Sequence, residues 1–171
     1  MKDPEVRVAV ISGRSSRAFT LIEMVFVLGI IALLALMTIP LYMERNIQLQ
    51  VKEGVEFAGF MQRNVSAAYA LSGALPKDNA GAGLPAPEKV IGNYIVSGTV
   101  SDGVITLVFG NLAVKNIRGR KLTLRPGYVA DAPQVPISWV CGPGKMPAGL
   151  TIAGSDATDI PQQWLPAACR P

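Results

Sequence analysis

The sequence predicts an α+β fold in which one long N-terminal helix packs on a roughly four-stranded antiparallel sheet. Three observations lead to this fold class. An uninterrupted apolar segment lies near the N-terminus, a helical stripe of apolar residues follows it, and short β-type segments occur after residue 93. Helix followed by strands, rather than alternation of the two, is typical of α+β proteins.

The apolar segment comprises 20 consecutive uncharged residues, Met24 through Met43. A helix of that length spans about 30 Å, the hydrocarbon thickness of a bilayer. A core helix of a soluble protein is usually shorter or carries a polar stripe, and a cleaved signal peptide has a shorter apolar run with a small-residue cleavage site. Arg14 and Arg17 precede the run, which places the N-terminus in the cytoplasm and residues 44–171 outside.

A second stretch of apolar residues recurs at spacings of three and four, as one face of a helix does. Its members are Ile47, Val51, Val55, Ala58, Met61, Val65 and Ala68. Together the two stretches predict one helix from about Phe19 to Leu71, apolar in its first half and amphipathic in its second. Pro40 removes one helical hydrogen bond and should kink the helix, and Gly54 and Gly59 weaken it by about 1 kcal/mol each relative to alanine.

The rest of the chain reads as a loop over residues 72–92 and a sheet over residues 93–141. The loop is rich in Gly, Ala, Pro and Asn. Ser101-Asp102-Gly103 joins the first two strands as a hairpin, and the third strand alternates polar and apolar residues, so we expect it to be half exposed. The predicted strands are Tyr94–Thr99, Val104–Phe109, Lys121–Arg125 and Ile137–Cys141.

The two cysteines, Cys141 and Cys169, lie near the C-terminus, and the sequence contains no histidine. The predicted outside location favours a disulfide over two free thiols. Such a bond would close a loop of 29 residues and contribute about 3–4 kcal/mol in the chain-entropy model. Without histidine, zinc sites built on histidine and histidine-based catalytic dyads are excluded.

Patterns that suggest enzymes or ligand sites are incomplete. Gly142-Pro143-Gly144-Lys145 lacks the spacing and the Ser/Thr of a phosphate loop, so it is interpreted as a turn. Asn64-Val65-Ser66 has the form of a glycosylation sequon but lies on a predicted helix. Asp156 and Asp159 are interpreted as solvated loop residues rather than metal ligands. We therefore predict no enzyme activity, no metal and no cofactor.

A basic cluster occupies 11 residues that contain no acid. It consists of Lys115, Arg118, Arg120, Lys121 and Arg125. One interpretation is a strip that contacts DNA through counterion release. The other is a solvated edge that discourages strand-to-strand aggregation. Because no aromatic residues are interleaved, the second is favoured and DNA remains a possible partner.

The start of the apolar helix carries the most specific pattern in the chain. Ala18-Phe19-Thr20-Leu21-Ile22-Glu23-Met24 behind a basic leader resembles the processing site of type IV pilins and pseudopilins. The resemblance implies that a prepilin peptidase cuts between Ala18 and Phe19 and that Phe19 becomes N-methylated. Glu23 and Pro40 match the family's glutamate and proline. Ala18 stands where the family usually has glycine, and the 18-residue leader is long; we expect cleavage to persist at a lower rate.

Glu23 is a carboxylate inside an apolar segment, where an unpaired charge costs a few kcal/mol. It either reaches the headgroup level or, as the resemblance implies, pairs with the Phe19 amine of a neighbouring subunit. The resemblance further implies a homo-oligomeric filament, inner-membrane assembly machinery and a single-pass inner-membrane precursor with a periplasmic C-terminus. The extracellular pilus then supports adhesion, twitching motility or DNA uptake.

The cysteine pair resembles the disulfide-bound loop of type IVa pilins, which favours a pilin. The alternative is a minor pilin or a pseudopilin of a type II secretion machine. The expected organisation is a leader at residues 1–18, a transmembrane and filament-core helix at 19–43, and a head domain at 44–171 with a disulfide loop at 141–169.

Overall fold

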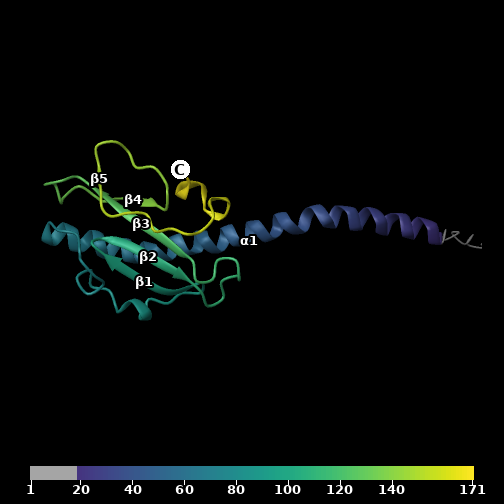
Figure 1. Ribbon diagram of the computed structural model, residues 1–171, viewed down its shortest axis with the longest axis horizontal. Coiled ribbons are helices and arrows are strands. Elements are labelled where there is room, and N and C mark those ends of the chain that lie inside the picture. The colour runs from purple at the N-terminus through teal and green to yellow at the C-terminus, as the bar shows by residue number, and fades with distance from the viewer. Residues whose placement is uncertain (1–18) are drawn as a thin grey trace, which may run out of the picture. The chain divides into compact units, whose positions relative to one another are not determined.

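The computed structural model describes residues 19–171, apart from the side chains of residues 39–41. Its principal elements are the helix α1 (Leu21–Ser72) and the strands β1 (Ile95–Ser101), β2 (Val104–Phe109), β3 (Lys121–Tyr128), β4 (Ser138–Cys141) and β5 (Thr151–Ile152) (Figure 1). Three short 3-10 helices, η1 (Pro87–Lys89), η2 (Gln162–Trp164) and η3 (Ala167–Cys169), lie in the connections. The α+β prediction is confirmed.

The predicted helix is confirmed, with its start two residues later and its end one residue later than expected. It runs for 52 residues and continues across Pro40. Gly73 follows it with φ of 71°, and its N–H donates to the Tyr69 carbonyl at 2.8 Å. A glycine in the left-handed conformation is a common helix terminator because it lacks a Cβ that would clash. The chain divides into two compact units, of which the second, the head, begins at Pro40.

The apolar stripe of the head's helical segment is buried as predicted. Ile47, Val51, Ala58, Met61 and Val65 are each less than 5% exposed. Val55 and Ala68 are half-buried, so they lie at the border of the stripe. The stripe packs on the inner face of the sheet, where Ile105, Leu107, Phe109, Leu122 and Leu124 are buried.

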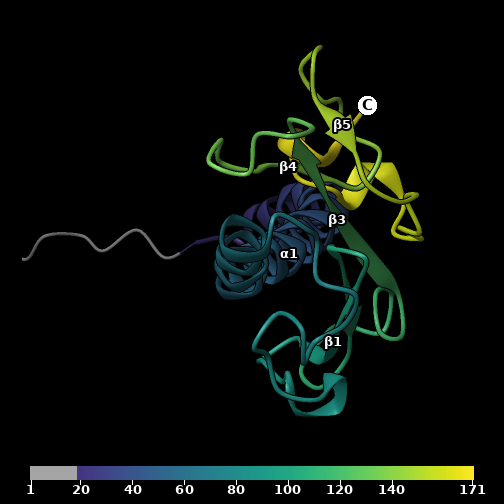
Figure 2. The same ribbon diagram turned by 90° about the vertical axis from the view of Figure 1, so that its left-hand side faces the viewer.

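The sheet is antiparallel with the order β1-β2-β3-β4, and β5 pairs with β3 off this path. Figure 2 shows α1 on one side of the sheet, between the parts of the chain that carry β1 and β4. All four predicted strands are present with ends shifted by up to three residues. The two-residue β5 was not predicted, because Thr151-Ile152 is too short to give an alternating pattern.

Gly54 lets the helix approach the sheet. A Cβ added at this position would lie 2.6 Å from Phe109 Cζ and 2.9 Å from Phe109 Cε1. Both distances are shorter than carbon–carbon contacts normally allow, so only glycine fits against the ring without rearrangement. The glycine that weakens the helix by propensity therefore makes its packing on β2 possible.

The connection between α1 and β1 is fixed by the buried side chain of Asn79. Its Oδ1 accepts from the Val100 N–H at 2.6 Å, and its Nδ2 donates to the carbonyls of Gly98 at 2.9 Å and Pro85 at 2.8 Å. The amide thus pairs with the outer edge of β1 as a neighbouring strand would. An edge whose backbone groups are satisfied is closed to pairing with other chains.

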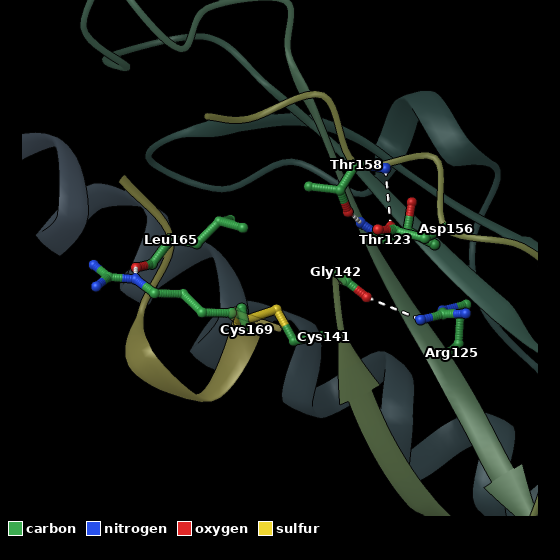
Figure 3. Close-up of a disulfide and its surroundings, with 9 residues drawn as sticks. Thr123, Arg125, Cys141, Gly142, Asp156, Thr158, Leu165 and Cys169 are labelled. Atoms are coloured by element: carbon green, nitrogen blue, oxygen red, sulfur yellow. Dashed lines mark hydrogen bonds between the residues drawn. A yellow bond between two sulfur atoms is a disulfide. The ribbon is translucent and has the colours of Figure 1, made fainter. Parts of the chain in front are cut away.

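The third strand departs from its predicted half-exposed pattern. Thr123 is fully buried because the C-terminal segment crosses β3 at this point. The Thr123 N–H donates to Thr158 Oγ1 at 3.0 Å (Figure 3), and Thr123 Oγ1 accepts from the Ala157 N–H at 3.2 Å. The alternation of residue types could not reveal a covering segment that lies over 30 residues further along the chain.

Candidate functional site

The helix start at Leu21 is defined by Thr20. Thr20 Oγ1 accepts a hydrogen bond from the Glu23 N–H at 3.3 Å, and the Thr20 carbonyl accepts from the Met24 N–H at 3.2 Å. These contacts make Thr20 the N-cap, which satisfies a backbone donor that the first helical turn would leave unpaired. Phe19 precedes the cap and is 69% exposed. Ala18 and the leader at 1–18 lie outside the described residues.

The sequence-based interpretation missed this cap. Thr20 followed by Glu23 is a Ser/Thr-x-x-Glu pattern at the start of an apolar run, which is the signature of a capping box. That pattern could have identified Thr20 as the residue that sets the helix start. The observed helix begins two residues after the predicted start at about Phe19, because Thr20 is the N-cap.

The N-terminal part of α1 presents apolar side chains on all sides. An 18-residue window of the helix has a mean hydropathy of 2.7, and none of it is buried. By length and composition it is the one helix among the described residues that could cross a membrane. Within this part the Thr38 hydroxyl, Oγ1, donates to the Leu34 carbonyl at 2.7 Å and so is satisfied within the helix. Such a surface requires lipid or protein around it.

Glu23 is the one charged residue between Phe19 and Met43. It lies in the first turn of α1, where the positive end of the helix dipole favours a carboxylate. The ion pair found within the described residues is Lys52–Glu56, at 3.7 Å on the exposed face of the head's helical segment, and it does not include Glu23. A partner for the Glu23 carboxylate must therefore come from outside the described part of the chain or from water. Pro40, the second predicted assembly residue, lies on the same helix.

The predicted disulfide is confirmed. Cys141 at the end of β4 and Cys169 in η3 are joined, and both residues are buried (Figure 3). Around the bond, Leu165 is buried and the Arg170 Nε donates to the Leu165 carbonyl at 2.9 Å. The bond thus attaches the C-terminal segment to the sheet.

The patterns set aside during sequence analysis have structural roles. Gly142 has a φ of 53° and begins a turn. Asp159 accepts from the Lys121 N–H at 2.6 Å and so attaches the C-terminal segment to β3, whereas Asp156 accepts from the Thr158 N–H at 3.0 Å within that segment. Asn64 donates to the Phe60 carbonyl within α1. Among residues 19–171 no group of His, Cys, Asp and Glu is arranged to hold a metal.

Comparison with known proteins matches both parts of the chain. A family model described as Pilin (bacterial filament) matches residues 50–170, and a model of the prokaryotic N-terminal methylation motif matches residues 13–39. The chain is 31% identical over 160 residues to the type IV major pilin protein PilE1 of Neisseria gonorrhoeae, which covers 90% of this chain and 87% of that one.

Two further relatives give the same result. The fimbrial protein EcpC of Eikenella corrodens is 32% identical over 157 residues, covering 90% of each chain. A fimbrial protein of Neisseria meningitidis serogroup B is 29% identical over 163 residues, covering 90% of this chain and 94% of that one. In each comparison the similarity therefore extends over nearly the whole length of both sequences.

Proposed function

This chain belongs to the type IV pilin family, and on that basis we propose that it is made as a membrane-held precursor, cut between Ala18 and Phe19, and polymerised through its N-terminal helix. Members of the family are structural filament subunits rather than enzymes. The observation that carries the proposal is the apolar surface of α1 before residue 39, which no other part of residues 19–171 covers. Lipid covers it before assembly, and the helices of other subunits cover it afterwards.

Cleavage changes the charge at the start of the helix. Removal of the leader leaves an ammonium group on Phe19, which is exposed and lies just before the Thr20 cap. In a bundle of such helices the Phe19 amine of one subunit neutralises Glu23 of its neighbour. A buried carboxylate without a partner costs several kcal/mol, so subunits in the wrong register are disfavoured. N-methylation of Phe19 keeps the positive charge that this pairing needs.

The processing steps define the partners and the location. A prepilin peptidase removes residues 1–18 on the cytoplasmic side, and inner-membrane assembly machinery extracts the mature subunit. The head, with its disulfide, lies in the periplasm before assembly and on the extracellular pilus afterwards; that oxidising side of the membrane suits the Cys141–Cys169 bond. Adhesion, twitching motility or DNA uptake are the roles that such a pilus would serve.

A test of the pairing compares two glutamates in a pilus-deficient host that expresses this chain. Glu23→Ala should leave the protein in the membrane with few filaments in the sheared surface fraction, because the Phe19 amine loses its partner. Glu44→Ala removes an exposed carboxylate just beyond the apolar run and serves as the matched control with normal filaments. A normal filament yield from Glu23→Ala would contradict the pairing.

The abundance of the subunit in the same sheared fraction distinguishes a major pilin from a minor pilin or a pseudopilin. A major pilin should be the dominant protein there. A minor pilin or pseudopilin should be a trace component or absent, while the membrane fraction contains similar amounts in either case. The relatives described as major pilins favour the first outcome.

A further inference from the structure

The structure divides the basic cluster into two parts with different surroundings. Arg125 lies in the middle of β3, is half-buried, and its Nη2 donates to the Gly142 carbonyl at 3.0 Å. The other four cations lie in or directly after the connection between β2 and β3, and three of them are exposed. We call these four residues the basic rim: Lys115, Arg118, Arg120 and Lys121.

The basic rim lies at the end of the sheet near the start of the head's helical segment. The β1–β2 turn at Asp102-Gly103 is at one end of β2, and the connection that carries the rim is at the other (Figure 1). The Val114 N–H donates to Gln50 Oε1 at 3.0 Å, which fixes that connection against α1. Gln50 follows Met43, the last residue of the apolar run, by about 10 Å along the helix axis.

The arginines of the rim are held in place by backbone carbonyls. Arg118 Nη2 donates to Ala113 at 3.0 Å and to Asn111 at 3.3 Å. Arg120 donates through Nε to Asn116 at 3.0 Å and through Nη1 to Asp159 at 2.7 Å. Neutral carbonyl partners leave the positive charge of each guanidinium in place, so the two arginines are fixed cations that are not neutralised by an ion pair.

An exposed leucine accompanies these cations. Leu112 lies in a turn of the same connection and is 74% exposed. A cationic surface with an exposed aliphatic side chain is typical of protein surfaces that lie on anionic lipid. Surfaces that follow single-stranded nucleic acid instead interleave cations with aromatic rings, and the segment from residue 110 to residue 121 contains none.

The positive charge of the head is concentrated in this region. The head, residues 44–171, contains 12 basic and 9 acidic residues and has a formal net charge of +3, of which the four residues of the basic rim contribute +4, so the remainder carries −1. Asp159 is the acid that contacts the rim, and its carboxylate binds the Lys121 N–H. An anionic surface therefore attracts this end of the head more strongly than the rest.

From these observations we propose that the basic rim rests on the anionic phospholipid headgroups of the leaflet from which the head emerges. The inference depends on the membrane-held precursor proposed above. Contact between the rim and the headgroups orients the head on the membrane before assembly. Entry into a filament, in which the subunit leaves the bilayer, requires that this contact be broken.

Lysine acetylation of the full chain in lipid nanodiscs tests the proposal. One set of nanodiscs contains phosphatidylcholine alone, and the other contains equal parts of phosphatidylcholine and phosphatidylglycerol. Exposed Lys77 and Lys89, which lie outside the rim, are internal references for Lys115 and Lys121. We expect phosphatidylglycerol to slow acetylation of the two rim lysines by about fivefold relative to the references, the effect of one basic residue at an anionic surface. High salt should abolish the difference.

A pair of variants provides the control. Leu112→Gln with Arg118→Gln should reduce the protection of both rim lysines. Arg63→Gln with Leu71→Gln changes an exposed arginine and an exposed leucine elsewhere on the head and should leave the protection intact. Equal rates in the two kinds of nanodisc would overturn the proposal, as would protection by a DNA duplex but not by phosphatidylglycerol.

The same samples separate this inference from the proposed function. Slow hydrogen exchange over residues 24–43 in both kinds of nanodisc reports insertion of the apolar segment. If these amides are protected and the rim lysines do not respond to phosphatidylglycerol, the lipid contact alone is wrong. If the segment does not insert, both the membrane-held precursor and the lipid contact are wrong.

Discussion

Gly54 is the helical position where an added methyl group would meet the sheet, and Gly54→Ala should destabilise the head. The new Cβ would lie 2.6 Å from Phe109 Cζ and 3.5 Å from Ile95 Cδ1. Phe109 is fully buried, so its ring cannot turn toward solvent to make room. Overpacking of this kind costs about 1–3 kcal/mol. The higher helix propensity of alanine offsets about 1 kcal/mol of this cost.

The net effect is a loss of up to about 2 kcal/mol in the free energy of unfolding. For a chain of this size each kcal/mol lowers Tm by about 2–4 °C. Both tryptophans, Trp139 and Trp164, lie in the head, so the fluorescence of the full chain in detergent reports the unfolding of this part.

Gly59→Ala is the matched control on the same helix. The nearest atom to a Cβ at Gly59 is Arg63 Nη1 at 3.6 Å, an ordinary contact with a mobile side chain. This substitution should therefore stabilise the head by about 0.5–1 kcal/mol. Combining Gly54→Ala with Phe109→Leu should cost less than the sum of the two single changes. If Gly54→Ala raised Tm as Gly59→Ala does, the proposed close approach of α1 to β2 would be refuted.

Three further predictions concern the attachment of segments to the sheet. Replacing Cys141 and Cys169 together by serine removes a link across a separation of 28 residues and should lower the free energy of unfolding by about 3–4 kcal/mol in denaturant titrations; an unchanged midpoint would contradict this. Thr123→Val leaves the Ala157 N–H unpaired and should lower the free energy of unfolding by about 1–3 kcal/mol. Thr106→Val on the neighbouring strand should lower it by less than half as much in the same titrations. Asn79→Ala removes three hydrogen bonds and should cost about 2–4 kcal/mol, with faster proteolysis of the α1–β1 connection; resistance equal to wild type would argue against its role at the edge of β1.

The helix and the first two strands could be predicted because each has a local signature. The periods of 3.6 and 2 residues, the uncharged run before Glu44 and the Asp102-Gly103 turn are all visible within windows of a few residues. The end of α1 was predicted to within one residue because the glycine that stops it lies directly after it. The disulfide was predictable because the topology inferred from the apolar segment placed both cysteines in an oxidising compartment.

The features that were missed depend on contacts between distant parts of the chain. Thr123 reads as an exposed position of an alternating strand until Ala157 and Thr158 cover it. Asn79 reads as a loop residue, yet its amide completes the edge of β1. Gly54 reads as a weak point of the helix, although the ring of Phe109 requires it. No local pattern encodes which distant segment will arrive at such a position.

The candidate site was predictable as a pattern of residues but not as an arrangement of subunits. Glu23 and Phe19 are close in sequence, and the Thr20 cap that separates them could have been read from the Ser/Thr-x-x-Glu spacing. The pairing proposed for them joins two copies of the chain. A single chain therefore defines the chemical groups of the site, and the filament supplies their geometry.

The mature N-terminus is the most direct test of the account, because every later step depends on the cut between Ala18 and Phe19. Intact-protein and peptide mass spectrometry of the chain purified from a host with a prepilin peptidase measures it. We predict loss of residues 1–18 and an N-terminal Phe19 that carries one methyl group. A chain that retains its leader, or that is cut beyond the apolar segment after Met43, would contradict assembly through the N-terminal helix.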